Sequence, residues 1–203
     1  DNLTQVQAGY NPNRHDTDDK QLSHRFNDVI ITNGDENEYK NVIDIIFQKD
    51  EVARFISRKL YRWFVHFDIN SEVEANIIEP MAQMLIGDNY DVQATLMALL
   101  SSEHFYDMSI RGCMITHPID YLFKMVNTFE LELNQDILQE YNILKRLYTA
   151  MIPLQMIIYA PPTVAGWKAY YQAPQFYKIW INSVSLPLRM HYSDALAEGY
   201  DVS

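Results

Sequence analysis

Residues 50 to 67 read DEVARFISRKLYRWFVHF and form the most strongly periodic stretch of the chain. Apolar residues recur there at steps of three and four, the spacing that places side chains on one face of an α-helix. Asp50 is suited to cap the start of this helix. We therefore predict a helix of about five turns. The positions predicted to enter the core are Val52, Phe55, Ile56, Leu60, Trp63, Phe64 and Phe67.

The same stretch carries a group of basic residues. Arg54, Arg58 and Arg62 step by four residues and share one face of the predicted helix, with Lys59 beside them. Planar guanidinium groups suit carboxylates and phosphates. The arginines therefore either pair with carboxylates of the chain or bind an anionic ligand or a protein partner. Candidate internal partners are Asp16, Asp18 and Glu79.

Helical spacing continues along most of the remaining chain and predicts an all-α fold. Residues 1–38 are rich in Asn, Asp and Gly and predict an irregular polar arm, with one short strand at 28–32. Residues 39–203 are predicted to form a single-domain bundle of seven or eight helices. Pro80, Pro153 and Pro187 should kink or interrupt helices. Besides the stretch at 50–67, helices are predicted at 39–47, 71–87, 92–100, 119–129, 136–159 and 174–190.

Composition excludes several classes of protein. The chain has 203 residues, of which 48% are hydrophobic, so it can bury one good core. It carries 27 acidic and 16 basic residues and a formal net charge of -11, which would repel a nucleic acid. No apolar stretch approaches the roughly 20 residues of a transmembrane helix. We therefore expect neither a nucleic-acid partner nor a membrane span.

Conventional catalytic motifs are absent from the sequence. The glycines form no phosphate-binding loop or nucleophile elbow, and the six histidines never stand four residues apart. Cys113 is the only cysteine and is interpreted as a packed hydrophobe. We expect no cofactor and no structural metal. The His15-Asp16 loop, with carboxylates also at 18 and 19, is the best candidate for a metal-assisted hydrolase, although it lacks the glycine and distal Glu of a calcium loop.

The segment after residue 160 contains a turn followed by an aromatic cluster. Prolines restrict the backbone at 161 and 162, and Gly166 permits a positive φ just before Trp167. Trp167 is predicted to anchor the turn by packing, or alternatively to form a ligand platform with its aromatic neighbours. Those neighbours are Tyr170, Tyr171, Phe176, Tyr177 and Trp180.

Four ordered motifs resemble a known bacterial family. They are RFISRKLYRWFV at 54–65, SEHFY at 102–106, PPTVAGW at 161–167 and WINS at 180–183, with HDTDDK at 15–20 upstream. Together they resemble the family called domain of unknown function 1800, in its Bacteroidetes-like form. The resemblance covers what looks like the C-terminal half of longer, exported or envelope-associated members. It implies contact with an N-terminal half, and it supplies no activity.

These observations favour a binding or assembly module of an exported or cell-envelope bacterial protein. The arginine face of residues 54, 58 and 62 is the best candidate site, followed by Trp167. The alternative is an unrecognised metal-assisted hydrolase that uses His15 and Asp16. The sequence leaves open whether the chain is an enzyme, and it indicates neither a reaction nor an oligomeric state.

Overall fold

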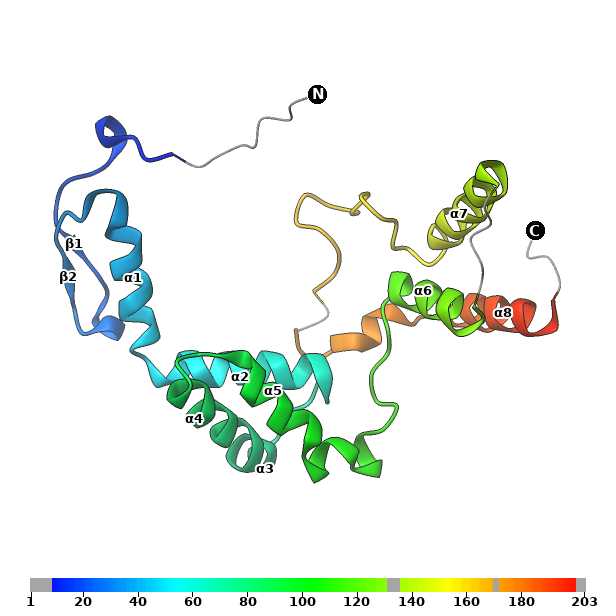
Figure 1. Ribbon diagram of the computed structural model, residues 1–203, viewed down its shortest axis with the longest axis horizontal. Helices are drawn as coiled ribbons and strands as arrows, with labels where there is room; N and C mark the ends of the chain where they lie inside the picture. The colour runs from blue at the N-terminus through cyan, green and yellow to red at the C-terminus, as the bar shows by residue number, and fades with distance from the viewer. Residues whose placement is uncertain (1–8, 131–135, 170–171, 200–203) are drawn as a thin grey trace. The chain divides into compact units, whose positions relative to one another are not determined.

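The computed structural model describes residues 9–130, 136–169 and 172–199, and it is mostly helical, as predicted (Figure 1). One small antiparallel pair of strands precedes the helices, with Lys20 opposite Ile31 and Gln21 opposite Ile30. The strands and helices are β1 (Lys20–Gln21), β2 (Ile30–Ile31), α1 (Glu38–Phe47), α2 (Asp50–Phe64), α3 (Ser71–Val73), α4 (Glu79–Gly87), α5 (Val92–Ser101), α6 (Pro118–Thr128), α7 (Ile137–Met151) and α8 (Ser185–Glu198).

The described residues group into two compact units. The first unit contains the chain up to Tyr61 together with Ile69–Ser102, and the second contains Arg62–Asp68 and the chain from Glu103 onward. Helix α2 therefore contributes residues to both units. No Pro-rich or Ser-rich linker marks this division in the sequence.

The core of the first unit lies where α2, α4 and the start of α5 meet. Ala53 and Ala82 are small enough for helix backbones to approach closely, and Leu85 fills the space beside them. Every fourth residue of α2 is buried, at Ala53, Ser57 and Tyr61. The prediction that Phe55 enters the core is wrong, because its side chain is 54% exposed. Trp63 is likewise 49% exposed.

A single turn of π-helix interrupts the helical run that begins at α3. It spans Glu74–Ile78 and ends where Pro80 follows. Proline has no N–H to donate and its ring clashes with the carbonyl four residues earlier, so a regular turn is disfavoured there. The backbone N–H of Glu79 instead donates to the carbonyl of Glu74, five residues back. The kink predicted at Pro80 is thus a local widening of the helix.

The second unit is built around α6, α7 and α8. Leu122 and Met125 of α6 pack with Met151 and Leu154, at and just beyond the end of α7. One side of α8 covers them with Leu188, Tyr192 and Leu196. A second cluster, of Met156, Tyr177 and Trp180, has Trp167 packed against it.

Two predicted helices differ in the structure. Helix α7 ends at Met151 rather than near residue 159, and Ile157 and Ala160 then form an isolated β-bridge. The helix predicted at 174–190 is wrong: a short 3-10 helix, Phe176–Trp180, is followed by α8. Pro187 lies in the first turn of α8, where its missing N–H removes no helical hydrogen bond.

Candidate functional site

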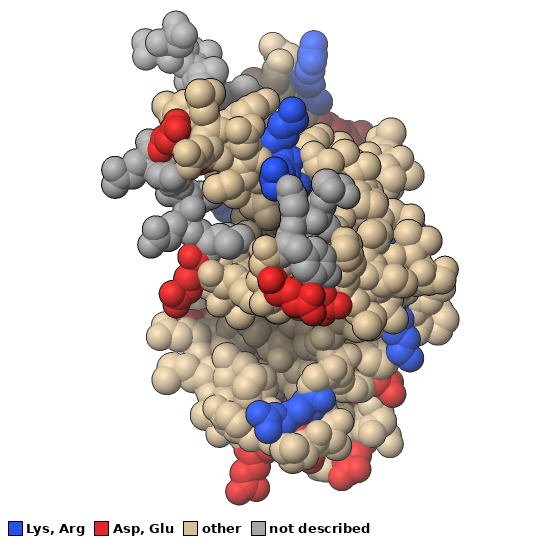
Figure 2. Space-filling view, turned by 90° about the vertical axis from the view of Figure 1, so that its right-hand side faces the viewer, with Lys and Arg blue, Asp and Glu red and all other residues tan. Residues whose placement is uncertain are grey.

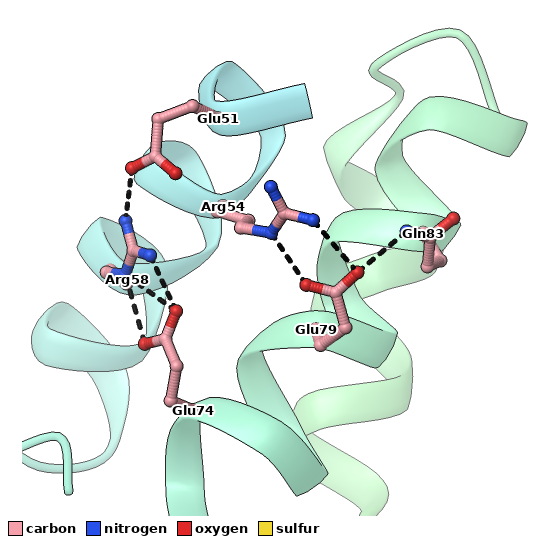
Figure 3. A network of polar contacts seen from close by, with 6 residues as sticks. All are labelled: Glu51, Arg54, Arg58, Glu74, Glu79 and Gln83. Atoms are coloured by element: carbon pink, nitrogen blue, oxygen red, sulfur yellow. Dashed lines mark hydrogen bonds and ion pairs between the residues drawn. The ribbon is translucent and has the colours of Figure 1, made fainter. Parts of the chain in front are cut away.

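Two residues of the arginine face of α2, Arg54 and Arg58, are held by carboxylates of the first unit (Figure 3). Arg54 Nε donates to Glu79 Oε2 at 2.7 Å, and its Nη2 lies 3.3 Å from Glu79 Oε1. Arg58 donates to Glu74 from Nε at 3.0 Å and from Nη2 at 2.6 Å. Its Nη1 donates to Glu51 Oε1 at 2.6 Å. These two arginines are therefore paired internally, one of the two alternatives that the sequence left open.

The π-turn explains how two glutamates reach two arginines. Arg54 and Arg58 lie one helical turn apart on α2. In a regular α-helix, residues five apart point in clearly different directions, whereas a turn that closes between residues five apart places them one above the other. Glu74 and Glu79 span such a turn. The sequence gives Glu79 as a candidate partner but not Glu74, because periodicity does not predict the π-turn.

The ion pairs shift the protonation of both partners toward the charged forms. The hydrogen bonds that Arg58 donates to Glu74 and Glu51 raise the pKa of Arg58, against the opposing effect of burial. The hydrogen bond from Arg54, with a second from Gln83, lowers the pKa of Glu79. Arg54 and Arg58 are 31% and 25% exposed, so part of each guanidinium still faces solvent.

Arg62 belongs to the second unit and has different surroundings. Its Nε donates to the carbonyl of Phe67 at 3.2 Å, and its guanidinium carbon lies 5.6 Å from the centre of the Phe176 ring. Its own carbonyl accepts a hydrogen bond from the Tyr177 hydroxyl. Arg62 therefore ties the end of α2 to the aromatic cluster of that unit.

The His15-Asp16 loop is organised around Glu38, a residue that the sequence did not single out as a site. His15 Nε2 lies 3.2 Å from Glu38 Oε2, and Lys20 Nζ lies 3.1 Å from Glu38 Oε1. Burial alone would raise the pKa of Glu38, but the hydrogen bonds from Lys20 and Gly34 lower it. Asp16 accepts the backbone N–H of Asp18 at 3.0 Å. The loop is thus tied down at the first residue of α1.

The described part of the chain places no group of three His, Cys, Asp or Glu side chains where they could share a metal ion. Cys113 is partly buried, and its Sγ donates to the carbonyl of Val65 at 3.3 Å. Burial raises the pKa of this thiol, which lowers its thiolate fraction at neutral pH. The hydrogen bond and the raised pKa agree with the interpretation of Cys113 as a packed residue.

Trp167 packs against the second unit's aromatic cluster and also lines a hollow of about 410 Å³. The turn before it is closed by Gly166 N–H donating to the Thr163 carbonyl at 2.9 Å, and Gly166 has a φ of 93°. The positive φ predicted for Gly166 is confirmed. Two of the predicted aromatic neighbours, Tyr170 and Tyr171, lie outside the described residues.

Fold and site together define a mostly helical protein in which three of the candidate site residues, Arg54, Arg58 and His15, face carboxylates of the chain itself. The family model described as "Protein of unknown function (DUF1800)" matches residues 2–202. The chain belongs to this family. No curated protein and no solved structure matches it. Across the described residues, every helix is too short or too polar to span a membrane.

Proposed function

We propose that this protein is an assembly module in which helix α7 joins two copies of the chain. The observation that carries the proposal is a row of large apolar side chains along α7. Ile137, Tyr141, Leu144 and Tyr148 are 79%, 63%, 45% and 48% exposed. A continuous apolar row on one helix, unlike scattered surface residues, is typical of an interaction surface.

The spacing of this row suits a second helix as its partner. The four residues follow one another at steps of four, three and four, the repeat of the seam between two supercoiled helices. Met151 continues the repeat but is buried in the core of its own unit, so the far end of α7 is anchored. The hydroxyl groups of Tyr141 and Tyr148 can hydrogen-bond to water while the two chains are apart.

The charges beside the seam favour a second copy in parallel orientation. In a parallel pair, the residue before one seam position lies beside the residue five places further along the other helix. Glu140 would then lie beside Lys145 of the second copy, and two-fold symmetry would form this pair twice. By the same rule, Leu147 would lie beside Ile152. An antiparallel pair centred on Leu144 would instead place Glu140 near Tyr148.

The charge distribution also supports contact with protein. Figure 2 shows a face of the molecule that is mostly neither acidic nor basic, although the chain has a net charge of -11. A surface of this kind gives little electrostatic attraction to a polymer of phosphates or sulfates.

The test exchanges the charges beside the seam. Glu140→Lys and Lys145→Glu each place like charges together in the parallel pair, whereas the double variant restores opposite charges. We expect each single variant to weaken self-association about three- to tenfold and the double variant to recover most of it. Sedimentation equilibrium over a wide range of protein concentrations measures the dissociation constant.

Lys124→Glu is the matched control, because it reverses an exposed charge on α6, outside the seam. It should leave the dissociation constant unchanged. A parent protein that stays monomeric at several hundred micromolar would overturn the proposal, as would a double variant weaker than both single variants. If the parent protein stays monomeric, the apolar row of α7 would have to bind something other than a second copy, such as another part of the longer proteins that the sequence motifs resemble.

An exported or cell-envelope location remains part of this proposal. It is supported by the resemblance of the motifs, and fractionation of cells that express the full-length protein tests it. The alternative of a metal-assisted hydrolase has no specific contact in its favour. His15 already faces the carboxylate of Glu38, and Asp16 accepts a backbone N–H of its own loop.

A further inference from the structure

The hollow in the second unit has apolar walls formed from segments distant in the sequence. Trp167 and Trp180 contribute indole rings, and Leu154, Ile157 and Pro162 contribute aliphatic surface. Its volume of about 410 Å³ falls in the range of small-molecule sites. None of these residues belongs to α7, so the hollow is independent of the assembly surface.

Two of the polar side chains that line the hollow beside Gln155 and Ser185, namely Asn182 and Lys168, offer hydrogen-bond donors. The side-chain oxygen of Asn182 already accepts the backbone N–H groups of Val184 and Ser185, at 2.9 and 2.8 Å, which leaves its amide N–H groups for a ligand. Lys168 adds an ammonium group at the exposed rim. The indole Nε1 of Trp167 is itself buried and has no acceptor among the described residues, so it can report on the hollow but does not open into it. Such a lining suits a ligand that accepts hydrogen bonds.

A buried cation, Arg189, contacts the backbone of Trp180, one of the residues that line the hollow. Arg189 is only 7% exposed, and its Nη2 donates to the carbonyls of Thr116 and Trp180 at 3.0 and 3.3 Å. Its guanidinium carbon lies 4.9 Å from the centre of the Tyr121 ring, and its Nε has no acceptor in the described chain. No carboxylate of the described residues forms an ion pair with it.

This arrangement leaves a positive charge without a counter-ion beside the hollow. Burial lowers the pKa of Arg189, but an arginine stays protonated in proteins. A nearby carboxylate, Asp120, lies 3.0 Å from His117 Nε2. Because Arg189 is buried and has no carboxylate partner among the described residues, its charge is screened less than that of a surface cation and favours a negative group nearby.

We propose that the hollow binds a small organic carboxylate, whose ring or chain lies against Trp167 and Trp180 and whose carboxylate group faces Lys168. The apolar walls recognise the body of the ligand, and the donors together with the uncompensated Arg189 recognise its charge. Carboxylates on aromatic rings and on sugar rings share this chemistry. The experiment therefore uses one probe of each kind.

The test follows the indole N–H signal of Trp167 by nitrogen-15 NMR. The chain has three tryptophans, and loss of one signal in Trp167→Phe assigns the one that matters. Phenylacetate and glucuronate are the probes, and 2-phenylethanol and glucose are their neutral counterparts. At least one anion should shift the Trp167 signal in a saturable way at millimolar concentration, and its neutral counterpart should not.

Lys168→Gln should weaken the binding of that anion about fivefold, since a solvent-exposed charge pair contributes modestly. Lys178→Gln is the control, because Lys178 lies over the Phe67 ring and does not line the hollow. Equal binding of acid and neutral counterpart would overturn the proposal. So would an unchanged affinity in Lys168→Gln, or no saturable shift with either anion.

Discussion

Arg58 shows how far a single residue could be predicted. The four-residue spacing predicts its position on the arginine face and allows internal pairing as one of two alternatives. Glu79 is confirmed as the partner of Arg54. The suggestion of Asp16 and Asp18 as arginine partners is wrong, because Arg54 pairs with Glu79, Arg58 pairs with Glu74 and Glu51, and Arg62 donates to the Phe67 carbonyl. Pairing across 16 residues depends on tertiary structure, which spacing does not report.

Replacing Arg58 by Gln should destabilise the protein by about 1 kcal/mol, because Glu74 and Glu51 both lose a charged donor at a partly exposed site. Lys59→Gln is the control, an exposed cation on the next residue of α2, and should change stability by less than about 0.5 kcal/mol. Urea unfolding measures both. Equal stability of the parent and Arg58→Gln, with a melting temperature raised by phosphate only in the parent, would instead assign Arg58 to an external anion.

Gly166 gives a second prediction at this scale. A Cβ at this position would meet no atom within 4 Å, so the cost of Gly166→Ala is conformational rather than steric. With a φ of 93°, alanine should destabilise the turn by roughly 1–2 kcal/mol. Gly87→Ala is the matched control, because Gly87 also has open space around it but ends α4 without a positive φ. A Gly166→Ala protein as stable as the parent would contradict this explanation.

At the scale of elements, periodicity predicted that helices exist but not always which face is buried. In α2 the aromatic residues satisfy helical spacing, yet Ala53, Ser57 and Tyr61 also lie on one face. Close approach of α4 selects the face with small residues, and Phe55 stays exposed. Which neighbour packs against a helix is a tertiary property, so it could not be read from the repeat.

The prolines of α4 and α8 show a second limit of prediction from the sequence. Pro80 and Pro187 were both expected to disturb a helix, but the two outcomes differ. Pro80 follows a π-turn that places Glu74 and Glu79 opposite the arginines, whereas Pro187 is accommodated in the first turn of α8. The outcomes differ because a turn of helix precedes Pro80 and none precedes Pro187. Only after a turn of helix does a proline remove a backbone hydrogen bond and clash with the carbonyl four residues earlier.

At the scale of the whole molecule, carboxylates outnumber cations but several of them hold the fold together. Glu38 and Glu79 both have lowered pKa values, for reasons visible in their hydrogen bonds. Composition alone predicts an acidic surface that repels itself. It does not indicate that particular carboxylates, paired with Lys20 and Arg54, stabilise the first unit.

The acid response of the protein should reflect these pairs. A carboxylate with a lowered pKa in the folded state contributes stability that is fully present above its unfolded pKa, for which 4.5 is the ordinary value of Glu. That contribution is lost as the pH falls through the lower, folded pKa. As the pH falls from 7 to about 5, the net charge of -11 becomes smaller in magnitude. The weaker repulsion between like charges then favours the folded state. Unfolding free energy should therefore decline mainly below about pH 4.5.

Glu38→Gln isolates one of these carboxylates. At pH 7 the variant should be less stable than the parent, because His15 and Lys20 lose a charged acceptor in a buried position. As the pH falls below 4.5, protonation removes the same charge from the parent, so the two curves of unfolding free energy should converge. Glu36→Gln removes an exposed carboxylate two residues earlier and should run parallel to the parent. If the Glu38→Gln curve also stayed parallel down to pH 3, the charge of Glu38 would not be what ties the loop of His15 to α1.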